Sequence, residues 1–284
     1  MPSLNKLEIK DFKFGIELES NINLYSMRDK LKFQTGWRCH EEHCGSEIVS
    51  PILVGWSGLL DVRRQIRSIW SVWNEIKFSD CGLHVHIDIQ DFNLGQAKKL
   101  ILIASRFDQT IFCMMDGTRW INTYAQRCSY KEKTIKTISG LKGLQGIQRH
   151  SQRYAGLNMH AFSKHGTVEF RYAMGSADWR KIYSLISMYL RMVAVAKSET
   201  PVPKVIKIEG VSGRHALPII EANYKSLEKN KDTFFDFLQI KGGTRDVLSK
   251  MFMTNATDIK GRNGRTASQL TEQKQTIKFS LKDK

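Results

Sequence analysis

Two histidines alternate with aliphatic residues in the stretch CGLHVHID, residues 81 to 88. Side chains alternate between the two faces of a β-strand, so His84, His86 and Asp88 would share one face. The opposite face would carry only aliphatic side chains, those of Leu83, Val85 and Ile87. Two imidazoles on one face can bind a metal ion, although solvation or a few hydrogen bonds would also satisfy them.

The same alternation occurs in two other stretches with charged residues. FGIELES places Glu17 and Glu19 on one face, and GTVEFRYA places Glu169 and Arg171 on one face. If the three strands lie in one sheet, one face would pack on helices. The opposite face would then gather carboxylates, imidazoles and a guanidinium, which predicts a functional site.

This set of side chains favours hard divalent cations. Carboxylates with a histidine suit Mg²⁺ or Mn²⁺, whereas a structural zinc site would be expected to use thiolates. Several glutamates in one cavity repel one another unless cations lie between them, so we expect more than one ion. Arg171 cannot lose its proton and presents a fork that matches phosphate or carboxylate. Together these groups suit phosphoryl transfer.

The spacing of apolar residues predicts an α+β fold. We expect strands over 6–20, 45–54, 82–90, 152–162 and 166–174, and helices over 57–76, 93–115 and 177–197, the last two capped by Asn93 and Ser176. A further helix at 216–229 and shorter pieces to about 253 would follow. This order favours an antiparallel or mixed sheet with helices on one face and the active site on the other.

A doubly wound nucleotide-binding fold is not expected, since neither GxGxxG nor GxxxxGK[ST] occurs in the sequence. The predicted organisation has three parts: a catalytic domain over 1–200, a helical extension over 201–254, and a basic, disordered tail over 255–284. The longest apolar stretch, near residues 100–104, is too short to span a membrane, and the N-terminus does not resemble a signal peptide. These features predict a cytoplasmic protein without a membrane partner.

The chain of 284 residues carries a formal net charge of +16 and five cysteines. Such a surplus favours a polyanionic partner, such as nucleic acid or a phosphorylated substrate, although solvated loops would also explain it. Basic residues concentrate over 127–153 and over 260–284. The first of these segments is rich in glycine and lysine, so it could close over phosphates with Lys131 and Lys133. The odd number of scattered cysteines favours reduced thiols.

Five motifs in this order resemble the amidoligase family of phages and bacteria: FGIELE, CGSEIVSPIL, CGLHVHID, RYAGLNMHAF and GTVEFRYAMGS. The resemblance covers about residues 12 to 195. It implies a catalytic fold similar to that of glutamine synthetase and glutamate–cysteine ligase. It also implies ATP-dependent joining of a carboxylate to an amine through an acyl phosphate, with Mg²⁺ or Mn²⁺ as cofactor.

The resemblance also implies residue roles. Arg171 would bind the γ-phosphate or the acyl-phosphate transition state, and His86 would support the site from behind the ligands. Arg119, Asn122, Tyr124, Arg153 and Asn158 match polar positions of the family and would hold substrate or phosphate, although surface pairing and strand-end hydrogen bonds would also explain them. The implied metal ligands are Glu17, Glu19, Glu47, His84 and Glu169.

The stretch CHEEHC departs from the family pattern. Its residues Cys39, His40, His43 and Cys44 could bind zinc, but their spacing is not that of a zinc finger, which favours an ordinary buried thiol.

Two other functions remain open at this stage. A metal-dependent hydrolase or nuclease would use the same ligands, and a nucleic-acid-binding protein could retain a degenerate ligase site. The identities of the carboxylate and amine substrates do not follow from the sequence.

Overall fold

The computed structural model describes residues 9–23, 26, 33–42, 45–71, 81–115, 119, 122–128, 143–144, 146–147, 152–209 and 223–258. Seven strands and seven helices lie within these residues. The strands are β1 (Lys13–Ser20), β2 (Arg38–Glu42), β3 (Gly45–Val49), β4 (Leu53–Val54), β5 (Gly82–Asp88), β6 (Leu157–Asn158) and β7 (Thr167–Met174). The helices are α2 (Gly55–Trp70), α3 (Leu94–Arg106), α4 (Asp108–Cys113), α7 (Ala161–His165), α8 (Trp179–Lys197), α10 (Tyr224–Phe237) and α11 (Gly242–Asp258).

The strands form one open sheet in the order β2-β3-β1-β5-β7-β6, and β4 also pairs with β1. Every paired strand is antiparallel. The sequence prediction of an α+β fold is therefore confirmed. Of the two predicted sheet types, antiparallel and mixed, the sheet is antiparallel. Its similarity to glutamine synthetase in fold stays a prediction.

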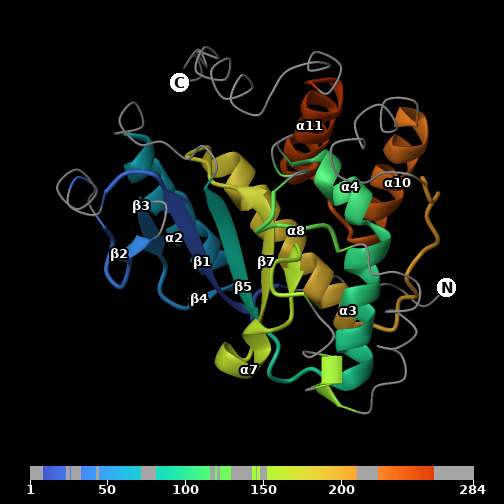
Figure 1. Cartoon of the computed structure of the whole chain (residues 1–284), viewed down its shortest axis with the longest axis horizontal. Helices are drawn as coiled ribbons and strands as arrows, with labels where there is room; N and C mark the ends of the chain where they lie inside the picture. The colour runs from blue at the N-terminus through green and yellow to red at the C-terminus, as the bar shows by residue number, and fades with distance from the viewer. Residues whose placement is uncertain are drawn as a thin grey trace.

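One face of the sheet is apolar and packs on helices, with α8 passing behind β5 and β7 (Figure 1). Phe170 of β7 stacks on Tyr189 of α8 with ring centroids 4.4 Å apart. Side chains from the three central strands are buried beneath the helices because they alternate with the polar residues of the other face. These include Ile16, Leu18, Leu83, Val85, Ile87, Val168 and Phe170.

The C-terminal helices α10 and α11 pack against the helices that precede them in the chain. Helix α11 contacts α8 and α4, and α10 contacts α4. The side chain of Asn255 donates a hydrogen bond to the Met114 carbonyl over 2.8 Å. The predicted disordered tail from residue 255 therefore begins too early, since α11 continues to Asp258, and residues 259–284 lie outside the described part. The division into domains stays a prediction.

Several predicted elements differ in detail. The helix expected over 93–115 is broken at Phe107 into α3 and α4. Most of the strand expected over 152–162 is turn and short helix, with only β6 paired. Asn93 caps α3 as predicted and forms a reciprocal capping box with Gln96. The N-cap of α8 is Asp178, not Ser176, because the Asp178 carboxylate accepts the Arg180 backbone N–H.

Across the described residues, no helix is both long enough and apolar enough to cross a membrane.

Candidate metal and phosphate site

The polar face of the sheet carries a band of ionisable side chains that crosses the strands. Cross-strand register creates this band, because residues directly opposite each other in antiparallel strands place their side chains on the same face. His84 lies opposite Glu17, and His86 lies opposite Glu169. Glu19 lies opposite Glu47. We call the group Glu17, Glu19, Glu47, His84, His86 and Glu169 the carboxylate–histidine cluster.

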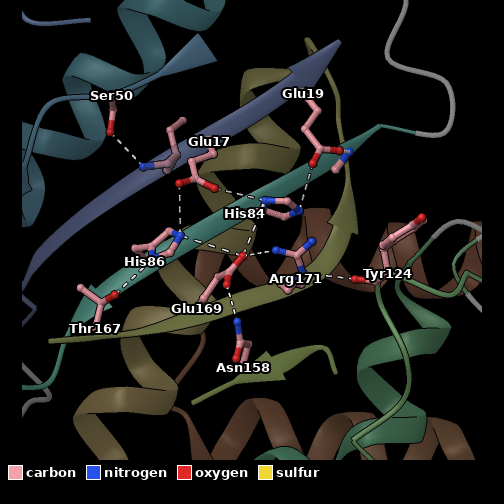
Figure 2. A network of polar contacts seen from close by, with 12 residues as sticks. Glu17, Glu19, Ser50, His84, His86, Tyr124, Asn158, Thr167, Glu169 and Arg171 are labelled. Carbon is pink, nitrogen blue, oxygen red and sulfur yellow. Dashed lines mark hydrogen bonds and ion pairs between the residues drawn. The ribbon is translucent and has the colours of Figure 1, made fainter. Parts of the chain in front are cut away.

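His84 lies at the centre of the cluster and is buried. Its Nδ1 lies 3.3 Å from Glu17 Oε2 and 3.6 Å from Glu169 Oε1, and its Nε2 lies 3.6 Å from Glu19 Oε1. Carboxylates from two neighbouring strands therefore surround one imidazole. Figure 2 shows these side chains converging above β1, β5 and β7.

His86 is also part of the cluster. Its Nε2 lies 3.4 Å from Glu17 Oε1 and 3.9 Å from Glu169 Oε1. That nitrogen is buried and, among the residues that the structure describes, has no hydrogen-bond partner of acceptable geometry. Its Nδ1 lies 3.1 Å from the Thr167 hydroxyl, so Thr167 fixes the orientation of the ring. The sequence placed His86 behind the ligands, whereas the structure brings it as close to the carboxylates as His84.

Two groups of potential ligand atoms lie close enough to hold a metal ion. In each group the ligand atoms lie within 4.8 Å of one another. The first group is Glu17, His86 and Glu169, and the second is Glu17, Glu47 and His84. The two groups share Glu17, so its carboxylate would belong to the ligand set of either ion. Glu19 lies outside both groups but contacts His84 and accepts the Gly82 backbone N–H over 2.6 Å.

The donor set fits the hard divalent ions that the sequence predicts. Carboxylate oxygens and imidazole nitrogens are suitable ligands for Mg²⁺ or Mn²⁺, and no thiol belongs to either group. The unpartnered Nε2 of His86 would gain a partner from a bound ion. The cluster therefore fits the predicted metals on the chemistry of the residues themselves.

Charge within the cluster is unevenly distributed. The pKa of Glu47 is raised to about 8, mainly by burial and in addition by the neighbouring carboxylates of Glu17, Glu19, Glu42 and Glu169. Burial also raises the pKa of Glu17, but the contacts of its carboxylate with the imidazoles of His84 and His86 outweigh burial and hold that pKa well below its usual value. A bound cation would relieve the repulsion between Glu47 and these neighbouring carboxylates.

Glu169 is held in place on both oxygens. Asn158 of β6 donates its side-chain amide to Glu169 Oε2 over 2.6 Å, and Arg171 forms an ion pair with Oε1. The Nε of Arg171 donates to the Tyr124 carbonyl over 3.1 Å. Arg171 therefore lies beside Glu169, whereas metal binding by Glu169 and phosphate binding by Arg171 stay predictions.

Arg119 is buried rather than open to substrate. Its guanidinium donates to the carbonyls of Arg171 over 2.8 Å and Tyr172 over 3.1 Å. The pairing of Leu83 with Ala173 and of Val85 with Phe170 leaves one extra residue on β7 at this point. Arg119 thus stabilises an irregular segment of β7 by donating hydrogen bonds to two of its backbone carbonyls.

The remaining predicted residues lie near the edge of the site or outside the described part. Asn122 accepts the Tyr124 backbone N–H over 2.7 Å, and Arg153 is exposed. Asn158 contacts Glu169, and its predicted contact with substrate stays a prediction. Lys131 and Lys133 fall outside the described residues.

The stretch CHEEHC, for which the sequence left zinc binding as the less favoured alternative, is divided by the sheet. Cys39 is buried in the core, while His40 lies opposite Glu47 on the polar face. Side chains on opposite faces of a strand cannot bind one ion, so a zinc site using both is excluded. His43 and Cys44 lie outside the described residues. Strand β2 was absent from the sequence prediction, so the place of His40 beside the cluster was missed.

A family model described as "Putative amidoligase enzyme" matches residues 10–193. The chain belongs to the amidoligase family. The match spans β1 to α8 and so contains every strand and every residue of the carboxylate–histidine cluster. It confirms the family resemblance predicted from the motifs, and it indicates an enzyme of the ligase type. A comparison with curated proteins gives no match.

Proposed function

We propose that this amidoligase is an ATP-dependent carboxylate–amine ligase that uses Mg²⁺ or Mn²⁺ and forms an acyl phosphate. One observation carries the proposal: the carboxylate–histidine cluster and Arg171 share one sheet face. A cluster of acids is suited to bind cations, and the adjoining guanidinium is suited to bind phosphate. A ligase that activates a carboxylate with ATP needs both.

Two ions would be held by the two groups that share Glu17. The first group uses His86 and Glu169, and the second uses Glu47 and His84. When bound, the ions would neutralise the negative charge of the ATP phosphates and of the carboxylate that is to be activated. Glu19, which contacts His84, would support the second group.

The chain's own residues would position the reacting groups. Arg171 would orient the transferred phosphate from its fixed place between Glu169 and the Tyr124 carbonyl. Asn158 would keep Glu169 in its ligand orientation. Fixed donors of this kind act on the transition state without a reorganisation cost.

The proposed reaction has two steps. A carboxylate oxygen attacks the γ-phosphorus of ATP, which forms the acyl phosphate and releases ADP. The amine then attacks the acyl carbon, the C–O bond to phosphate breaks, and an amide, phosphate and a proton are released. The released phosphate therefore contains one oxygen from the original carboxylate.

That oxygen provides the test. The protein is incubated with ATP, Mg²⁺ and a dialysable extract of small carboxylates and amines in water enriched in ¹⁸O, and the phosphate is analysed by mass spectrometry. The proposal predicts that ADP forms only with the extract and that the phosphate contains no solvent oxygen. A hydrolase would form phosphate containing ¹⁸O without the extract, which would contradict the proposal. Glu169→Gln serves as the control for a contaminating ATPase.

A further inference from the structure

Two exposed tyrosines lie together at the edge of the site. Tyr124 has 60% of its surface exposed and Tyr154 has 41%. Their ring centroids are 5.4 Å apart with the planes nearly perpendicular. The guanidinium of Arg153 lies 5.7 Å from the Tyr154 ring centroid. We call Tyr124, Tyr154 and Arg153 the aromatic edge.

Backbone hydrogen bonds fix the aromatic edge in place. The Gln126 N–H donates to the Tyr154 carbonyl over 2.6 Å, and the Gly156 N–H donates to the Gln126 carbonyl over 2.7 Å. These bonds join the two segments that carry the tyrosines. The Cys128 N–H also donates to the buried Asp108 carboxylate over 2.6 Å, which anchors the end of the first segment.

The aromatic edge is joined directly to the site. Arg171 donates from Nε to the Tyr124 carbonyl and pairs through Nη1 with Glu169 (Figure 2). The Arg171 N–H also donates to the Gly156 carbonyl over 2.7 Å, next to the second tyrosine segment. A ligand whose phosphate lies at Arg171 could therefore extend over the tyrosines.

Covering an exposed tyrosine ring with a flat ligand is favourable, because it buries apolar surface and adds a stacking interaction. Burying a tyrosine in the core is the usual way to use its apolar surface, as Tyr172 and Tyr189 do. At the aromatic edge, the rings and the Arg153 guanidinium are instead exposed beside Arg171, the residue proposed to bind phosphate. Aromatic rings and arginine planes stack on nucleobases, and arginine also attracts the phosphates that accompany them.

We propose that the aromatic edge binds a nucleobase of the substrate, which stacks on one of the rings of Tyr124 and Tyr154 and makes an edge-to-face contact with the other. The base would come either from ATP or from a single-stranded nucleic acid, and the net charge of +16 favours a ligand of this polyanionic class. The inference extends the proposed function, since it assigns the chemical class of a group that the ligase holds beside Arg171.

The test compares ligands with and without a base. One pair is ATP and inorganic tripolyphosphate, both with Mg²⁺. The other pair is a short single-stranded oligodeoxynucleotide containing 2-aminopurine and an abasic strand of equal length. Affinities are measured for the unaltered protein and for Tyr124→Ala, Tyr154→Ala and Tyr124→Phe. Trp56→Ala is the matched control, because Trp56 is an exposed aromatic on α2 outside the site.

Each alanine variant should lower the affinity for one base-bearing ligand by about tenfold and leave the affinity for the matching base-free ligand unchanged. Tyr124→Phe and Trp56→Ala should bind as the unaltered protein does. Weakening of ATP alone identifies its adenine as the base, and weakening of the oligonucleotide alone identifies nucleic acid. If neither base-bearing ligand is affected by either alanine variant, the inference is wrong.

The outcome is separable from that of the proposed function. If ATP binds in a metal-dependent way and neither alanine variant changes the affinity for ATP or for the oligonucleotide, this inference is wrong. The proposed ligase function would not be affected by that result. Tyrosine-dependent binding of the oligonucleotide without any ATP binding would support the inference and contradict the ligase.

Discussion

Asn158 and Glu169 lie opposite each other in β6 and β7, and the Asn158 amide donates to Glu169 Oε2 over 2.6 Å. The same asparagine accepts the His160 backbone N–H on Oδ1 over 2.8 Å, which fixes the orientation of the amide. A proposed metal ligand is thus oriented by a neighbour that itself has no freedom to turn. Such outer contacts commonly control metal affinity.

Replacing Asn158 by alanine should therefore weaken metal binding without removing a ligand. We expect Asn158→Ala to lower Mn²⁺ affinity by about 10- to 100-fold, measured by electron paramagnetic resonance of free Mn²⁺. Asn93→Ala is the matched control. It also removes an asparagine hydrogen bond, but at the N-cap of α3, so it should cost about 1 kcal/mol of stability and leave Mn²⁺ affinity unchanged. Equal affinities in both variants would contradict the role of Asn158.

Gly82 leaves the space that His84 and Glu19 occupy. A Cβ at this position would lie 2.6 Å from His84 Nε2 and 3.0 Å from Glu19 Oε2. Gly82→Ala should displace both side chains and strongly reduce Mn²⁺ affinity, while circular dichroism shows the fold retained. Gly243→Ala, where an added Cβ meets no atom within 4 Å, should have no such effect. Normal metal binding by Gly82→Ala would show that His84 is not needed as a ligand.

Glu47 should make the metal-free protein less stable as the pH rises. Its pKa is raised from 4.5 to about 8 by burial and neighbouring carboxylates. Above pH 4.5 the unfolded chain loses this proton while the folded chain keeps it, so the contribution of Glu47 to the free energy of unfolding falls until about pH 8. In urea titrations with EDTA, Glu47→Gln should flatten this decline.

Glu17 provides the opposite case, since contacts of its carboxylate with the imidazoles of His84 and His86 lower its pKa despite burial. Its ionised form is favoured in the folded state, so Glu17→Gln should lose stability at neutral pH where Glu47→Gln gains it. Stabilisation by both variants would mean that carboxylate repulsion alone governs the cluster.

Arg119 should act on β7 rather than on substrate. Arg119→Lys keeps the charge but loses the fork that reaches two carbonyls, which should cost about 1 to 3 kcal/mol of stability because a buried acceptor loses its donor. Arg64→Lys, at an exposed pair with Asp61, should change stability little. Unchanged stability of Arg119→Lys together with lost ATP affinity would instead support the direct substrate contact that the sequence predicted.

The sequence predicted the centre of the site because strand alternation is a local property. Glu17, His84 and Glu169 each belong to a strand with a clear apolar face, so their shared face followed from residue type and spacing. The position of His40 opposite Glu47 was missed because the RCHEE strand has one buried residue, Cys39, and no apolar alternation. Its pairing depends on β3, which is a tertiary contact.

Other features depend on contacts that no local pattern encodes. The break between α3 and α4 at Phe107 interrupts a regular apolar period, and Asp108 at the break contacts Cys128 and Arg127 far along the chain. Likewise, the hydrogen bonds of Arg119 to β7 depend on the extra residue in that strand. The residue types at these positions were visible, but their partners were not.

The central claim is that the sheet face binds ATP through divalent ions, and isothermal titration calorimetry tests it most directly. ATP is titrated into the protein with excess Mg²⁺ and with excess EDTA, and then into Glu17→Gln, whose side chain belongs to both ligand groups. The account predicts ATP binding in Mg²⁺ that is lost in EDTA and strongly weakened in Glu17→Gln, with Asn93→Ala unchanged. Equal ATP affinity in Mg²⁺ and EDTA, or in Glu17→Gln and the unaltered protein, would contradict it.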